Sequence, residues 1–102
     1  MGEVHVSARD REVRVGLGDD VVLRLPENAT TGYRWHVERL DGGLEVVAGD
    51  YVPPGPLLPG AGGTRELRLR PSKAGQGLLE LALKQPWGED VAERYTLRVT
   101  VE

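Results

Sequence analysis

The chain contains no cysteine, which excludes disulfide bonds, thiolate metal sites and a cysteine nucleophile within it. No apolar run approaches the roughly 18 residues of a membrane-spanning helix, so we expect no membrane insertion. The 13 Lys and Arg residues are scattered and are outnumbered by 16 Asp and Glu residues, whereas a nucleic-acid surface needs a basic stripe. The 102 residues are enough for one domain with a modest core, which must be held by packing alone.

No segment shows the apolar stripe of a helix, and apolar residues instead alternate with polar ones, as in half-buried strands. One such face is formed by Tyr95, Leu97, Val99 and Val101. Turn signals such as Asp41-Gly42-Gly43 recur about every eight to twelve residues. We therefore predict an all-β fold, an immunoglobulin-like antiparallel β-sandwich of about seven to eight strands. Residues 1–102 are expected to form a single domain with Trp35 in its core.

Three connections between the predicted strands are longer or more polar than a minimal turn requires. The first follows Leu25, where Pro26 is expected to close the strand because it has no N–H to donate. The second is the stretch 53–63, rich in proline and glycine, and the third surrounds Trp87. Alternate connections of a sandwich emerge at the same end, so we expect these three loops to lie together.

Each of these loops contains a short motif. The motifs read Asn28-Ala29-Thr30-Thr31-Gly32-Tyr33, Gly60-Ala61-Gly62-Gly63 and Gln85-Pro86-Trp87. In this order they resemble the Asn-Pro-Thr-Thr-Gly-Tyr, Gly-x-Gly-Gly and Arg-Pro-Trp motifs of the chagasin-like inhibitors of cysteine peptidases. The resemblance covers essentially the whole chain. It departs at Ala29, where the family usually has proline, and at Gln85, where it usually has arginine and therefore a positive charge.

The resemblance implies a reversible, non-covalent inhibitor of papain-like (cathepsin-type) cysteine peptidases. Such a protein is not an enzyme, is a monomer, and needs neither cofactor nor metal. Its three loops would form a wedge in the active-site cleft, with Thr30 and Thr31 nearest the catalytic thiolate and histidine. Gly60 to Gly63 would approach one side of the cleft, and Trp87 would lie against an apolar surface on the other. The protein would be secreted or periplasmic if a leader once preceded it, and otherwise cytoplasmic.

Other interpretations of the same residues stay open. An immunoglobulin-like adhesion or carbohydrate-binding module would use Trp87, Tyr51 and Tyr33 as a stacking platform. Thr30 and Thr31 could be plain turn residues, and Trp87 could be a core residue. A phosphate cradle at Gly60 to Gly63 is disfavoured, because no helix follows to supply its dipole.

The remaining polar residues favour no separate site. His5 and His36 fall on polar faces and are expected to be exposed. A solvated acidic loop is the expectation for Glu89, Asp90 and Glu93, rather than a metal or acid–base cluster. The run Asn28-Ala29-Thr30 fits the acceptor pattern for N-glycosylation, but a glycan there would cover the expected wedge.

Overall fold

The computed structural model describes residues 2–28, 31–53 and 62–102, and these ranges contain strands and no α-helix. The strands are β1 (Gly2–Ser7), β2 (Glu12–Val15), β3 (Asp19–Glu27), β4 (Arg34–Asp41), β5 (Leu44–Val52), β6 (Gly63–Pro71), β7 (Gly75–Lys84) and β8 (Val91–Val101). Accordingly, the described part of the chain holds no helix that could cross a membrane. The all-β prediction is confirmed, and the eight strands agree with the expected number.

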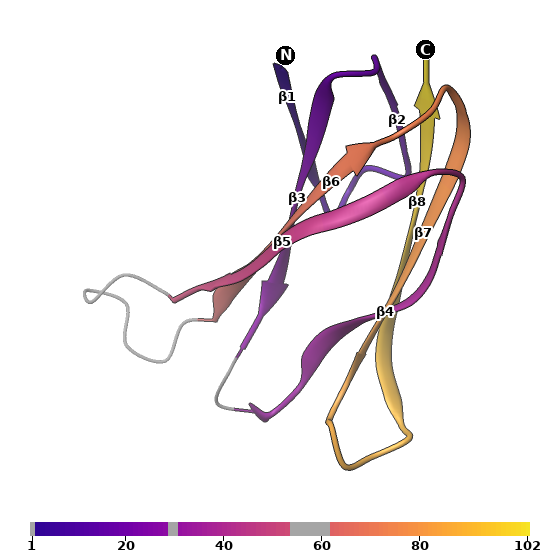
Figure 1. Ribbon diagram of the computed structural model, residues 1–102. Helices are drawn as coiled ribbons and strands as arrows, with labels where there is room; N and C mark the ends of the chain where they lie inside the picture. The colour runs from indigo at the N-terminus through magenta and orange to yellow at the C-terminus, as the bar shows by residue number, and fades with distance from the viewer. Residues whose placement is uncertain (1, 29–30, 54–61) are drawn as a thin grey trace.

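The strands form two four-stranded sheets (Figure 1). The first sheet has the order β1-β3-β6-β5 and the second sheet the order β2-β8-β7-β4. The pairings among β3, β5 and β6 and among β4, β7 and β8 are antiparallel, as predicted. The edge strands β1 and β2 instead pair in parallel with β3 and β8. Alternation does not reveal this difference, because a strand with one buried face has a period of two in either pairing.

The inward faces of both sheets form one aliphatic core. Its fully buried members are Val21, Leu23, Leu25, Leu69, Leu79, Leu81, Leu97 and Val99. Burying one such side chain contributes roughly 1.5–3 kcal/mol, and this packing stabilises a chain that has no disulfide. The predicted face from Tyr95 to Val101 is buried, and Trp35 packs against the core while remaining partly exposed.

Tyr95 joins the last strand to the connection by which the chain passes from one sheet to the other. Its hydroxyl donates a hydrogen bond of 2.6 Å to the backbone oxygen of Asp10, between β1 in the first sheet and β2 in the second. Burial raises the pKa of the Tyr95 hydroxyl to about 12. The group therefore remains a protonated donor at neutral pH.

Two local expectations are wrong. Pro26 does not close its strand, because β3 continues through Pro26, paired with Thr64, to Glu27. The pairing of β3 with β1 ends at Arg24, so beyond that point β3 has a neighbour on one side only and tolerates a residue without an N–H. His36 is half-buried rather than exposed. It lies opposite the buried Ala82, and its Nε2 atom has no hydrogen-bond partner among the described residues.

Candidate functional site

The three predicted loops connect β3 to β4, β5 to β6 and β7 to β8. The strand ends that carry them lie at one end of the sandwich, away from both chain termini (Figure 1). We call these connections the first loop (residues 28–33), the second loop (53–62) and the third loop (85–90). Four of the predicted site residues, Ala29, Thr30, Gly60 and Ala61, lie outside the described residues.

The first loop is shaped by hydrogen bonds to Thr31. Its backbone N–H and its hydroxyl both donate to the carbonyl oxygen of Asn28, at 3.2 and 2.8 Å. The same hydroxyl accepts a bond of 3.3 Å from the N–H of Tyr33. Gly32 follows with φ of +79°, a conformation that strongly favours glycine. Thr31 is exposed, but its hydroxyl hydrogen is already used within the loop.

The third loop lies directly against the first. The side-chain amide of Gln85 donates a bond of 3.2 Å to the carbonyl oxygen of Thr31, and the N–H of Gly88 donates to the carbonyl of Gln85 at 3.1 Å. The indole of Trp87 covers Gly32 so closely that a Cβ atom on that glycine would lie 2.9 Å from the ring. Trp87 is nevertheless 75% exposed. It is therefore a loop-tip residue and not a core residue.

The described C-terminal end of the second loop also lies beside the first loop. A Cβ atom on Gly62 would lie 3.6 Å from the Cβ of Asn28, an ordinary van der Waals contact. Gly62 is exposed, whereas Gly63 is buried and begins β6. The hydroxyl of Tyr51 occupies the space beside Gly63 that a side chain would need. The two glycines thus differ in role, since Gly62 faces outward and Gly63 makes room for Tyr51.

A residue that the sequence analysis did not select lies beneath the first two loops. The side chain of Glu27 is 1% exposed. One carboxylate oxygen accepts bonds from the backbone N–H of Trp35 at 2.8 Å and from Nε of Arg65 at 3.3 Å. The other accepts a bond of 2.7 Å from Nη2 of Arg65. The Arg65 guanidinium in turn lies over the ring of Tyr51, 5.6 Å from its centroid.

The signal for Glu27 is present in the sequence. Val21, Leu23 and Leu25 are buried on one face of β3, and a period of two places Glu27 on that same face. A carboxylate at such a position must be paired with a cation or hydrogen-bond donors. The expectation that Pro26 ends the strand hid this pattern.

The described residues of the three loops differ in how far they are exposed. Among the described residues, no group of three or more His, Asp or Glu side chains could hold a metal ion. Glu89, Asp90 and Glu93 are exposed, as expected. Tyr51 packs against Gly63, and the Arg65 guanidinium covers one face of its ring, so that face is not open for stacking. The exposed residues in the described parts of the three loops include Thr31, Gly62, Pro86, Trp87, Glu89 and Asp90.

Comparison with known proteins gives a match along most of the chain. The family described as "Chagasin family peptidase inhibitor I42" matches residues 14–101. Chagasin of Trypanosoma cruzi is 33% identical over 93 residues, covering 81% of this chain and 82% of chagasin. Amoebiasin-1 of Entamoeba histolytica is 29% identical over 94 residues, covering 88% of this chain and 89% of amoebiasin-1.

Among solved structures, the cysteine protease inhibitor EhICP2 from Entamoeba histolytica is similar over the full length. Its TM-score is 0.85 at 20% identity, and the match covers 100% of this chain and 97% of that one. At this level of identity the likeness concerns the fold. It agrees with the sandwich described above.

Proposed function

Because this chain belongs to the chagasin family of peptidase inhibitors, we propose that its three loops block the active-site cleft of papain-like cysteine peptidases, reversibly and without a covalent bond. The family is one of inhibitors, and the expectation that the chain is not an enzyme is confirmed by that membership. The target class follows from the three motifs and agrees with EhICP2, which is itself a cysteine protease inhibitor.

The observation that carries this proposal is the contact of the first loop with both of its neighbours. Thr31 is bonded to Gln85 across 54 residues of sequence, Gly32 lies under Trp87, and Asn28 lies beside Gly62. Such contacts hold separate loops in one arrangement before any partner arrives. Binding then costs little ordering entropy.

The shape of the first loop suits an inhibitor better than a substrate. The Thr31 N–H bonds back to the Asn28 carbonyl, and Gly32 has a left-handed backbone. Cleavage by a papain-like enzyme needs a peptide bond aligned with the thiolate and its oxyanion donors. A chain folded into a turn offers no such alignment, so the peptidase is blocked and the loop remains intact.

The roles within the wedge follow the family motifs. Thr30 and Thr31, flanked by Asn28, Ala29, Gly32 and Tyr33, lie nearest the peptidase thiolate and histidine. Gly60 to Gly63 approach one wall of the cleft. Gln85, Pro86 and Trp87 meet the opposite wall, where the exposed indole is suited to act as the anchoring residue.

The direct test is the residual activity of papain on a small peptide substrate with the purified protein in excess. We expect inhibition that is reversed by dilution, binding to a peptidase whose catalytic cysteine is replaced by alanine, and recovery of the inhibitor uncut. Undiminished activity of papain and of several cathepsin-type enzymes would overturn the proposal. A single cut between Ala29 and Gly32 would show that the first loop is a substrate.

A further inference from the structure

The carboxylate of Glu27 lies where the ends of four strands meet, and it belongs to none of the three motifs. Building on the proposed function, we infer that Glu27 is a positioning residue for the inhibitory loops. Its carboxylate holds both ends of the first loop and the C-terminal end of the second loop in the arrangement that the peptidase binds.

No backbone strand pairing joins the two ends of the first loop. The loop leaves β3 in the first sheet and enters β4 in the second sheet, so no strand pairing fixes their separation. The Trp35 N–H donates to Glu27 at 2.8 Å, and the Trp35 indole N–H donates to the carbonyl oxygen of Pro26 at 2.9 Å. These two bonds between the sheets close the first loop at its base.

Glu27 also reaches the second loop through Arg65. β3 and β6 are paired so that Leu25 lies opposite Arg65 and Glu27 opposite Gly63. The guanidinium makes two bonds to the Glu27 carboxylate and covers the ring of Tyr51 near the end of β5. Tyr51 and Arg65 stand on the two strands that flank the second loop. One carboxylate therefore joins the bases of two loops.

Stability alone does not explain a buried ion pair at this place. Replacing such a pair by apolar side chains of similar volume is often neutral or stabilising. An apolar residue could not accept the Trp35 N–H, which belongs to an edge strand and points at Glu27. What the carboxylate supplies and an apolar side chain does not is the simultaneous hold on β4 and β6. Loss of that hold lowers the fraction of molecules with correctly placed loops, and the apparent affinity falls by the same fraction.

The test compares Glu27→Gln with Asp20→Asn. Asp20 is the matched control because it also lies on β3 and also bonds to arginines of β6, Arg68 and Arg70, away from the loops. We expect Glu27→Gln to weaken inhibition of papain about tenfold, mainly through slower association, and Asp20→Asn to change it less than about twofold. Arg65→Lys, which keeps the charge and loses the two-pronged contact, should fall between them.

Two further measurements separate positioning from loss of folding. Val99→Ala, in the core, destabilises the protein without touching the loops, and at a temperature where it stays folded it should inhibit normally. Hydrogen exchange in the free protein should show loss of protection at the Trp35 amide in Glu27→Leu, whose side chain accepts no hydrogen bond, and not in Val99→Ala.

Unchanged inhibition in Glu27→Gln, or unchanged Trp35 exchange in Glu27→Leu, would overturn the inference. So would equal losses of inhibition in Glu27→Gln and in a Val99→Ala variant of the same stability. If the wild-type protein inhibits no papain-like enzyme, the proposed function fails, while the exchange measurement still decides whether Glu27 holds the loops. Should Glu27→Gln not fold, Arg65→Lys serves for the same comparison.

Discussion

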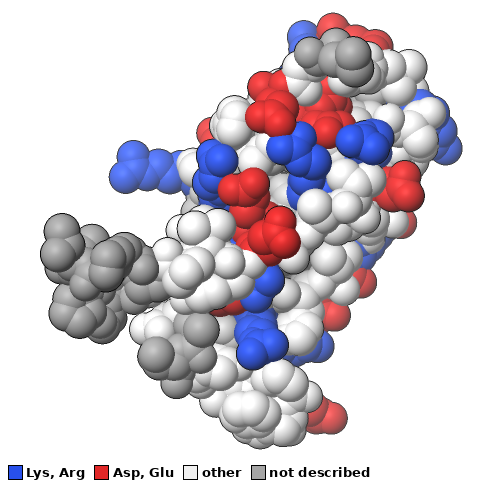
Figure 2. Space-filling view, turned by 60° about the vertical axis from the view of Figure 1, so that its left-hand side comes forward, with Lys and Arg blue, Asp and Glu red and all other residues white. Residues whose placement is uncertain are grey.

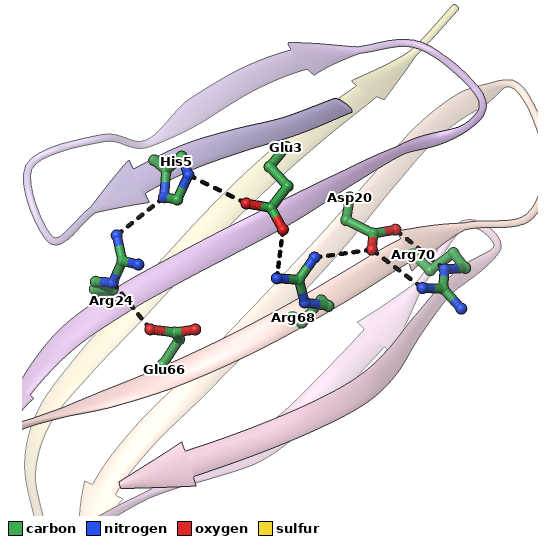
Figure 3. Close-up of polar contacts among 7 residues, drawn as sticks. All are labelled: Glu3, His5, Asp20, Arg24, Glu66, Arg68 and Arg70. Atoms are coloured by element: carbon green, nitrogen blue, oxygen red, sulfur yellow. Dashed lines mark hydrogen bonds and ion pairs between the residues drawn. The ribbon is translucent and has the colours of Figure 1, made fainter. Parts of the chain in front are cut away.

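Two ionic assemblies link β3 and β6, one at the loops and one towards the termini, and they differ in nearly every respect. At the loops stands the single pair of Glu27 and Arg65, with side chains 1% and 19% exposed. The other assembly, the ion-pair ladder, covers the outer face of the first sheet (Figures 2 and 3). Its members are Glu3, His5, Asp20, Arg24, Glu66, Arg68 and Arg70.

The ladder is more extensive, and the exposure of its side chains ranges from 14% at Asp20 to 56% at Arg70. Arg68 and Arg70 bond to Asp20 at 3.0 and 3.1 Å, and Arg24 bonds to Glu66 at 3.0 Å. His5 is exposed, as the sequence predicted, and its Nδ1 lies 2.9 Å from Arg24. The Arg24 and Arg70 side chains are about half exposed, at 48% and 56%. Water and salt screen such charges, so many of these contacts contribute little to stability.

Burial, and not the number of ion pairs, decides which assembly the fold depends on. Breaking a buried pair leaves a charge without water and without a partner. Breaking an exposed pair returns both charges to water. The ladder therefore tolerates change, whereas the pair beneath the loops does not.

The largest effect is expected when the buried pair is broken. Glu27→Ala should lower the free energy of unfolding by roughly 3 kcal/mol, because Arg65 is then left mostly buried without a carboxylate. Glu66→Ala in the ladder should cost under about 1 kcal/mol. Urea denaturation of both variants measures the difference, and equal losses would contradict the distinction between the assemblies.

The next effect concerns binding at the loop end. Trp87→Ala should weaken inhibition by about 2 kcal/mol, some thirtyfold, while the fold survives because the indole is 75% exposed. The control is Leu17→Ala, an exposed apolar residue bonded through its backbone to the C-terminal Glu102. Titration against papain should show no change for that variant. A drop in melting temperature with normal inhibition would place the binding surface elsewhere.

A smaller effect is expected at Gly32. Gly32→Ala forces a side chain into a left-handed backbone and into Trp87, and we expect a loss of about 1–2 kcal/mol in stability together with weaker inhibition. Gly18→Ala is the matched control, since Gly18 has φ of +99° and open space around it. It should show the backbone strain alone and inhibit normally. Equal inhibition by the two variants would mean that Trp87 need not lie on Gly32.

The smallest effect at neutral pH concerns the ladder itself. Hydrogen bonds from Arg70 and Arg68 hold the pKa of Asp20 below its usual value of 3.8. A carboxylate with a lowered folded-state pKa stabilises the fold above its unfolded pKa and loses that contribution as pH falls through the folded value. Asp20→Asn should therefore flatten the pH dependence of the melting temperature below about pH 4. A difference in melting temperature between wild type and variant that stays constant from about pH 2 to about pH 6 would contradict this.

Much of the sandwich could be predicted from the alternation of side chains. The face from Tyr95 to Val101 is buried as expected, and the strand ends that carry the three long or polar connections lie at one end of the sandwich (Figure 1). The parallel pairing of β1 and β2 could not be predicted, because a strand's partner is a long-range choice that its own pattern does not record. The exposure predicted for His36 is wrong for a related reason, since its burial depends on what lies opposite it across the sheet.

The sequence is enough to predict most of the strands, the core face, the loop motifs and the family, because each of these depends on residues close together in the chain. The contacts that fix the positions of the loops become visible only in the tertiary structure. Glu27 meets Arg65 across 38 residues and Gln85 meets Thr31 across 54. The residues around each partner in the sequence do not indicate what the other partner is. Only the folding of the two sheets onto one core brings these groups within hydrogen-bond distance. Because the Glu27 carboxylate is buried there, it must be paired with a cation or hydrogen-bond donors.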